Sequence, residues 1–292
     1  MSTATTPRSP KFVRQVVAAA NRSIRSSIGL TQDPPPICDD TELAYFPVDG
    51  IARLVHGDLA AMLAGGIGSL FYQMLHPYAM AGVAQHSRYQ DDPLGRMLQT
   101  ANFIGFTTYG TKATAAAAIE RVLAVHEAVR GVADDGTPYY ANDPHLLLWV
   151  HCAEISMFLE GYLRYGPEKL TRDECDIYVA EVARITRNMG VSNPPNSYDE
   201  LQSCLQSFAP ELRLSADGAV ARDWLRRGVM VQGWQRAGYR LVVRASFLLL
   251  PPTAQSALGV RPHPVMDALF TRPLMKLLAG VMHRVVPPVR RA

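Results

Sequence analysis

The sequence lacks the signatures of several common protein classes. Its four cysteines, Cys38, Cys152, Cys175 and Cys204, form no CxxC pair, so we interpret them as reduced thiols and expect neither a disulfide scaffold nor a zinc ribbon. "HCAE" has no downstream CxxC of a zinc deaminase, and "VHEAV" lacks the second histidine of HExxH. There is no GxSxG and no GKS/T after a strand, and "GGIG" does not match GxGxxG. The common nucleophile and cofactor signatures are therefore absent.

A strong charge bias and long apolar runs are missing as well. The 29 lysines and arginines are dispersed and the net charge is only +3, so we expect no nucleic-acid partner. Basic residues interrupt the apolar residues of positions 1–30, which excludes the apolar core of a signal peptide there. "LVVRASFLLLPP" is broken by Arg244 and Pro251 and is too short to cross a bilayer. These absences predict a soluble, cytoplasmic protein.

Helical periodicity is the dominant pattern in the chain. Apolar residues recur at three- and four-residue spacing along most of the sequence, whereas strand-like alternation is scarce. No internal repeat and no shift in composition divides the chain. We predict a single all-α domain over residues 1–292, with roughly ten helices. It comprises an N-terminal helix and linker in 1–40, a core in 41–250 and a basic amphipathic segment in 251–292.

Capping signals indicate where several helices begin. Asp92 before Pro93, and Asp143 before Pro144, are N-cap residues followed by the proline favoured at the first helical position. "TRDE" and "SYDE" each match the capping-box pattern. The helix after Asp143 is apolar over much of its circumference, so we predict that it is central and buried.

Glycine and proline predict where helices are interrupted. Gly65, Gly66 and Gly68 follow a helix that runs through Leu63, and we expect them to loosen its backbone. Pro77 either kinks the next segment or starts a new helix.

His126 is the first candidate site residue, because it stands in the apolar stripe of "AIERVLAVHEAVRG". Arg130 follows at i+4 on the same predicted helix face, and Gly131 is expected to end the helix. A haem-binding helix would use such an imidazole for iron and such a guanidinium for a carboxylate. The alternative is a core histidine bonded to a carbonyl, with Arg130 stabilising the helix C-terminus. The residues alone favour this alternative.

Further polar residues are candidates for a site. His151 has Glu154 one turn later, which is typical either of a ligating histidine oriented by a carboxylate or of a buried structural pair. Arg96 and Thr100 share a helix face and would line an apolar cavity with polar groups, or they form an exposed face. The third group surrounds a predicted loop, where histidines are typically surface residues; it consists of His76, His86 and Arg88.

The order of these motifs resembles the MpaB-type oxygenases, a family whose relatives include the rubber oxygenase called latex clearing protein. Six segments carry the resemblance: "GDLAAMLAGGIGSLFYQMLHPYAMAGVAQHS", "DPLGRMLQT", "AVHEAVRG", "YYANDPHLLLWVHCAEI", "LTRDECDIYVAEVARITRNMG" and "LLLPP". Each segment is short and degenerate. Their order and spacing cover most of the chain and make the resemblance fairly specific.

The resemblance implies an all-α fold with a globin-like core that holds a b-type haem. It implies that His126 is the proximal iron ligand and that Arg130 is a pocket arginine one turn later. Arg96 and Thr100 match residues that line the distal side of the haem in the rubber oxygenase. His151 resembles another motif histidine of the family and is the second candidate for an iron ligand or pocket residue.

Two departures from the rubber oxygenase limit what the resemblance implies. Gln99 stands where that enzyme has a lysine that closes the sixth position of the iron, so that position is open or is capped by water, His86 or His151. That enzyme also uses a glutamate as base, whereas this chain has no glutamate between Glu42 and Glu120. Cleavage of polyisoprene by the same mechanism is therefore not implied.

We expect a haem-dependent oxygenase that acts with dioxygen on a small apolar, isoprenoid or lipid-like substrate. The alternatives are a non-catalytic haem- or lipid-binding protein on the same scaffold, and a cofactor-free helical protein that binds a small ligand. The basic amphipathic tail "RPLMKLLAGVMHRVVPPVRRA" would contact an anionic membrane surface, or it packs its Leu and Val face on the core. The second interpretation of the tail is the simpler one.

Overall fold

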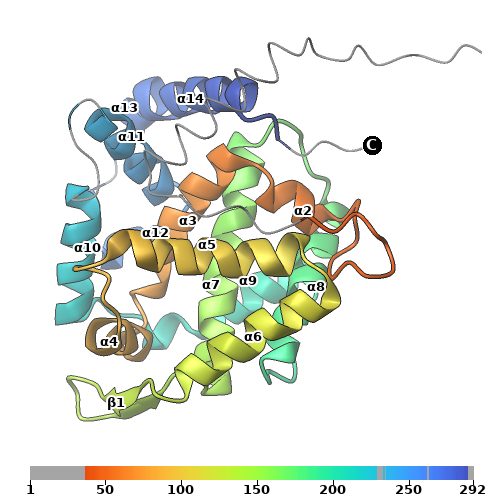
Figure 1. Ribbon diagram of the computed structural model, residues 1–292. Helices are drawn as coiled ribbons and strands as arrows, with labels where there is room; N and C mark the ends of the chain where they lie inside the picture. The colour runs from red at the N-terminus through yellow and green to blue at the C-terminus, as the bar shows by residue number, and fades with distance from the viewer. Residues whose placement is uncertain (1–36, 229–232, 234, 262, 289–292) are drawn as a thin grey trace, which may run out of the picture.

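The computed structural model describes residues 37–228, 233, 235–261 and 263–288, and most of them are helical (Figure 1). The described residues form a mostly helical single domain, which confirms the predicted class. The globin-like character of the core stays a prediction. The N-terminal helix expected within residues 1–40 lies outside the described residues, which begin at Ile37.

The elements are helices joined by short loops, with one small ribbon. The first are α2 (Ile51–His56), α3 (Leu59–Gln73), α4 (Pro77–His86), α5 (Pro93–Tyr109) and α6 (Lys112–His126). The antiparallel strands β1 (Arg130–Val132) and β2 (Pro138–Tyr140) lead to α7 (Pro144–Tyr165), α8 (Arg172–Asn188), α9 (Tyr198–Ser207) and the 3-10 turn η1 (Ala209–Glu211). There follow α10 (Ala216–Arg227), α11 (Gln235–Phe247), α12 (Pro252–Ala257), α13 (Pro264–Met266), the π-helical turn η2 (Asp267–Thr271) and α14 (Arg272–Val285).

The central, buried helix is α7, as predicted. It runs through the middle of the molecule (Figure 1). Its residues Trp149, Leu159 and Tyr162 have no exposed surface. Its 22 residues are long and apolar enough to cross a membrane by length and composition, but 72% of its most apolar stretch is buried within the fold. Other helices therefore cover α7 on most sides.

α3 crosses α7 at a close approach that requires glycine. A Cβ on Gly65 would lie 2.6 Å from the carbonyl oxygen of Met157. A Cβ on Gly161 would lie 2.6 Å from the carbonyl oxygen of Ala61. Both distances are far inside van der Waals contact, so each helix uses a glycine to admit the backbone of the other. The two helices form the most extensive contact between elements of the described chain.

The glycines of α3 therefore do not loosen it, and that prediction is wrong. The side chain of Asp58 caps the helix, which continues through Gly65, Gly66 and Gly68 to Gln73. Packing against α7 outweighs the low helix propensity of glycine, which is a weak local preference. The helix then ends, and the axis turns by 104° into α4.

The capping residues are confirmed, although only one of the two predicted capping boxes forms, because the Glu200 carboxylate accepts the Asn196 backbone N–H and not that of Ser197. The side chains of Asp92 and Asp143 each accept a backbone N–H of the following first turn, with proline at the start of α5 and α7. Thr171 and Glu174 make both hydrogen bonds of a capping box, and Ser197 caps α9. Pro77 starts α4 instead of kinking a longer helix.

The glycine crossing predicts opposite effects for two neighbouring substitutions. Gly161→Ala inserts a methyl group against the backbone of α3, and we expect it to lower the free energy of unfolding by about 1–3 kcal/mol. A Cβ on Gly66 has nothing within 4 Å, so Gly66→Ala should raise stability by about 0.5–1 kcal/mol through helix propensity. Urea unfolding of both variants measures these changes. Equal effects of the two substitutions would contradict the crossing.

Candidate functional site

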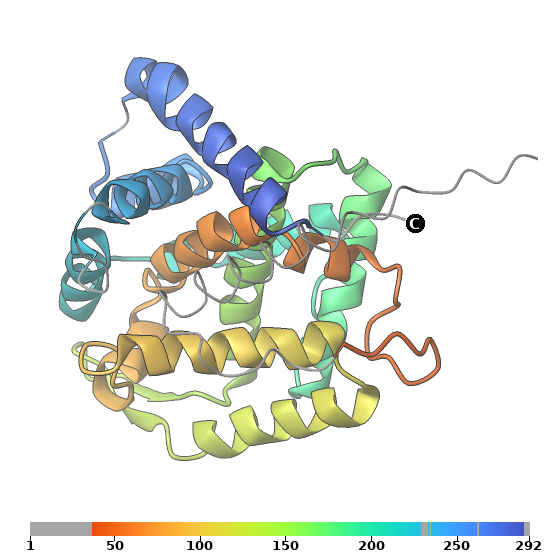
Figure 2. The same ribbon diagram turned by 45° about the horizontal axis from the view of Figure 1, so that its top comes forward.

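α5 and α6 form a helical hairpin on one side of α7 (Figures 1 and 2). Gly110 and Thr111 connect them, and the Thr111 hydroxyl caps α6 by accepting a backbone N–H of its first turn. Arg96 and Thr100 lie in the first half of α5, while His126 is the last residue of α6. The hairpin therefore carries three of the predicted site residues.

His126 has an imidazole that is neutral and incompletely hydrogen-bonded. Its Nδ1 is buried without a hydrogen-bond partner in the described structure. Burial lowers its pKa, the nearby Asn142 opposes this shift, and the charge of Arg96 lowers the pKa further. Asn142 Oδ1 is itself buried without a partner, so the two groups lie near each other without a well-formed hydrogen bond. A neutral imidazole with a nitrogen to spare is the form that binds a metal.

Arg130 does not share a helix face with His126, and that prediction is wrong. α6 ends at His126, and Arg130 begins strand β1, opposite Tyr140. The Arg130 side chain is 64% exposed and donates to the carbonyl oxygen of Glu127 over 2.6 Å. Its guanidinium lies 5.0 Å from the centre of the Tyr140 ring. The helix ends before Gly131 because the next residues pair with β2 instead of continuing the turn.

Arg96 and Thr100 lie one turn apart on α5, and both side chains are exposed. Burial nevertheless lowers the pKa of Arg96, and the charge of Glu154 opposes this shift. Exposure and a lowered pKa are compatible if protein surrounds the Arg96 guanidinium on several sides while water still reaches it. The Thr100 hydroxyl donates to the Arg96 carbonyl over 3.3 Å, which leaves its oxygen lone pairs as acceptors.

The pKa of Glu154 on α7 depends on burial and on the charge of Arg96, and His151 is not among its causes. Burial raises the pKa of Glu154 from 4.5 to about 7, although the charge of Arg96 lowers it. The charge of Glu154 also contributes to the raised pKa of Tyr178 on α8, after burial itself. A carboxyl group with a pKa near neutrality can both accept and release a proton, which is the property of a general base or acid. No sequence motif links Arg96 on α5 with Glu154 on α7, so sequence reasoning missed this interaction.

His151 is buried in the core, as its place in α7 predicts. Burial lowers its pKa to about 3, and the charge of Arg187 adds to the shift. Its Nε2 has no hydrogen-bond partner in the described structure, so the predicted pair with Glu154 does not orient this nitrogen. His151 therefore stays neutral at physiological pH, which keeps it as the second candidate ligand.

His56 shows what a satisfied histidine looks like in the same core. Its Nδ1 lies 2.8 Å from Thr108 Oγ1, and its Nε2 lies 3.0 Å from the Tyr178 hydroxyl. Burial lowers its pKa to about 3. Both nitrogens are used, so His56 links α2, α5 and α8 and is not free to bind a metal.

The loop histidines divide into one surface and one core residue. His86 and Arg88 are exposed, as predicted, at and just beyond the end of α4. His76 has no exposed surface, so its expected place at the surface is wrong. It precedes Pro77 at the corner between α3 and α4, where the 104° bend turns its side chain toward α7 and Glu211. His76 contributes to a separate cluster described below.

The described fold is helical, and within it the charge of Arg96 lowers the pKa of both the His126 imidazole and the Glu154 carboxyl group. An imidazole, a guanidinium and a carboxyl group are a set suited to redox or acid-base chemistry on a bound group. The sequence profile of the ER-bound oxygenase mpaB/B'/rubber oxygenase catalytic domain matches residues 53–280. The chain therefore belongs to this oxygenase family, and membership suggests an oxidoreductase. No curated protein and no solved structure matches the sequence.

The raised pKa of Glu154 predicts how its replacement changes stability with pH. The folded state keeps a proton that the unfolded state releases at lower pH, so this contribution is present below pH 4.5 and is lost as the pH rises through about 7. The parent protein loses this contribution as the pH rises from about 5 to about 8, whereas Glu154→Gln does not. We therefore expect the free energy of unfolding of the variant, minus that of the parent protein, to increase over this range. Urea unfolding at both values measures the change.

Glu120→Gln is the matched control, because Glu120 is exposed on α6. Its stability relative to the parent protein should vary less with pH. The raised pKa of Glu154 would be contradicted if the difference in unfolding free energy between Glu154→Gln and the parent protein did not depend on pH. It would also be contradicted if the parent protein became relatively more stable at high pH.

Proposed function

We propose that the protein is a haem-dependent oxygenase that acts with dioxygen on a small apolar, isoprenoid or lipid-like substrate. The observation that carries the proposal is the imidazole of His126. It is neutral, it has a buried nitrogen without a partner, and it lies near the charge of Arg96. It does so in a chain that belongs to an oxygenase family.

The residues present fit a b-type haem. Such a group needs a neutral imidazole, an apolar surface for the macrocycle and a cation for the propionates. His126 supplies the first and Arg96 supplies the third. The second is available on α5, whose apolar side chains are only half-buried: Met97, Leu98, Phe103, Ile104 and Phe106. When bound, haem would supply the iron that reacts with dioxygen.

Arg96 and Glu154 would control charge and protons at the site. The guanidinium of Arg96 would bind an anionic group through its fixed N–H donors. Burial raises the pKa of Glu154 to about 7, which suits a group that accepts and releases a proton near neutral pH. We assign its carboxylate the role of the base that accepts a proton from the substrate. Thr100 would orient a bound small molecule through its hydroxyl.

Gln99 would be a weak ligand for the iron of a bound haem. Its side chain is exposed on α5, directly before Thr100. An amide is a poorer iron ligand than the amine of a lysine, so a small molecule would have access to the iron. Glutamine in place of lysine at position 99 also supports a second candidate function. In this alternative the protein is a haem or lipid carrier that has lost catalysis together with the lysine.

The visible spectrum of the haem-loaded protein tests the ligand. We expect a Soret band in the parent protein and in His151→Ala, and a lost or strongly weakened band in His126→Ala. The control is His263→Ala, because the side chain of His263 is exposed between α12 and α13. A band that disappears only in His151→Ala would move the iron to α7. No band under any loading condition would remove haem from the proposal.

Oxygen uptake with a lipid extract separates an oxygenase from a carrier. Removal of a general base typically lowers the rate by about 10²–10⁴-fold, and we expect Glu154→Gln to fall in this range while keeping its Soret band. Uptake that is absent from the haem-loaded parent protein would contradict the oxygenase and favour the carrier.

The C-terminal helices present an apolar face to solvent. Seven large apolar side chains along α13, η2 and α14 are between 46% and 67% exposed: Val265, Met266, Leu269, Phe270, Leu274, Leu277 and Val281. On α14 Met275 and Ala279 are buried and Leu278 and Met282 pack against the core, so this helix packs one side on the core as expected but leaves part of its Leu and Val face exposed. Figures 1 and 2 show α14 on the side of the molecule opposite α6.

We propose that this apolar face contacts an anionic membrane surface. Arg272, Lys276 and Arg284 are exposed on α14. Asp267 is the one acidic residue between positions 261 and 288, and it is buried in an ion pair with Arg244. Exposed apolar and basic side chains on one helix are the combination that binds anionic lipid, and a membrane would suit an apolar substrate.

Liposome sedimentation tests the membrane contact. Phe270→Ser combined with Leu277→Ser removes two large apolar groups, and we expect binding to vesicles that contain phosphatidylglycerol to fall by at least about tenfold. Ile177→Ser is the control, because Ile177 is 47% exposed on α8, away from this face. Equal losses in the two proteins, or unchanged binding of the double variant, would contradict the contact.

A further inference from the structure

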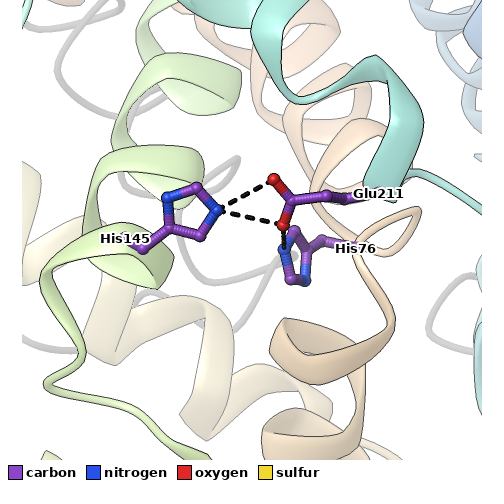
Figure 3. A group of neighbouring side chains, drawn as sticks. All are labelled: His76, His145 and Glu211. Carbon is purple, nitrogen blue, oxygen red and sulfur yellow. Dashed lines mark hydrogen bonds and ion pairs between the residues drawn. The ribbon is translucent and has the colours of Figure 1, made fainter.

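Two histidines and a glutamate from three separate elements meet at one point (Figure 3). His76 lies at the corner between α3 and α4, His145 lies in the first turn of α7, and Glu211 ends η1. His76 Nε2 is 3.2 Å from Glu211 Oε2, and His145 Nε2 is 2.9 Å from Glu211 Oε1. The ligand atoms of all three residues lie within 4.8 Å of one another.

The protein core holds this cluster in place. The ring of His76 is fully buried, with its centre 6.0 Å from the Trp149 ring and 6.3 Å from the Phe208 ring. The His145 ring lies 4.5 Å from Phe208. Just beyond Glu211, the backbone N–H of Arg213 donates to the Leu75 carbonyl over 2.8 Å. The donor atoms are therefore oriented by packing and by the backbone.

The hydrogen bonds of His76 are incomplete without a further partner. Its Nδ1 is buried with no hydrogen-bond partner in the described structure, while its Nε2 faces a carboxylate oxygen. If the proton is on Nδ1, the lone pair of Nε2 points at the carboxylate. If the proton is on Nε2, a bare Nδ1 is buried. A cation between the three residues would remove the repulsion between the Nε2 lone pair and the carboxylate, because both Nε2 atoms and the carboxylate would donate lone pairs to it.

The three side chains supply donor atoms that suit a divalent cation, namely one nitrogen from each of His76 and His145 and a carboxylate oxygen from Glu211. Two imidazoles and one carboxylate are a donor set typical of Zn²⁺, with a fourth position left for water.

We propose that His76, His145 and Glu211 form a Zn²⁺ site that joins the α3–α4 corner, the start of α7 and η1. A tetrahedral Zn²⁺ keeps its ligand atoms about 3.3 Å apart, which small side-chain rotations reach from the present separations. The fourth position faces the solvent side, where the side chains of His145 and Glu211 are 54% and 37% exposed. The site shares no residue with the proposed haem site, so it stands independently of that function.

Zinc titration of the chelator-treated, full-length protein tests the site. We expect calorimetry to show one Zn²⁺ per chain and thermal unfolding to shift upward when Zn²⁺ is added. Replacement by Co²⁺ should give the visible bands of tetrahedral cobalt. Glu211→Gln should weaken Zn²⁺ binding by at least about 100-fold, since even outer partners of a ligand change affinity by about 10–100-fold.

Two further variants keep the test interpretable. His145→Ala removes an exposed ligand with little risk to folding and should also weaken binding, whereas His263→Ala and His126→Ala should bind Zn²⁺ like the parent protein. Circular dichroism confirms that each variant is folded. Folded Glu211→Gln and His145→Ala proteins that bind Zn²⁺ like the parent, or a parent protein that binds none, would overturn the proposal.

Discussion

The approach of α3 to α7 at Gly65 and Gly161 is the constraint on which the rest of the structure depends. Each glycine admits the backbone of the other helix, so the two helices set each other's position without intervening side chains. α7 then presents His151 and Glu154 from the core, and its first turn presents His145. α3 leads directly to His76. A shift of this crossing would move the groups of both candidate sites.

The electrostatics distinguish residues that serve the fold from residues that remain available for chemistry. His56 uses both ring nitrogens within the core and is therefore structural. His126 keeps a buried nitrogen without a partner and lies within the field of Arg96. Arg96 also acts on Glu154, where its charge lowers a pKa that burial raises. Unsatisfied and strongly shifted groups of this kind are characteristic of functional sites.

Local signals in the sequence predict local structure well. The caps at Asp92 and Asp143 act within one helical turn, so their residue types are sufficient to locate the starts of α5 and α7. The role of Gly65 is not predictable from its neighbours, because it depends on α7, far away in the chain, and tertiary packing overrides helix propensity. α6 ends earlier than the sequence predicts, because pairing of β1 with β2 competes with the helix beyond His126.

The candidate sites were predictable only in part for the same reason. The position of His126 in an apolar stripe, together with the family resemblance, indicated a cofactor ligand. The approach of Glu154 to Arg96 joins two helices with no fixed spacing between them. Glu211 meets two histidines from distant segments at a short 3-10 turn that no motif marks. Such groupings follow from the packing of the core and carry no signature in the chain.

We propose that a haem binds to His126 at the end of the α5–α6 hairpin. A crystal structure of the haem-loaded protein, with the iron located by its anomalous scattering, tests this claim most directly. We expect iron within bonding distance of the His126 imidazole, on the side of α6 that faces Arg96. Iron bound to His151, or haem bound away from both histidines, would contradict it.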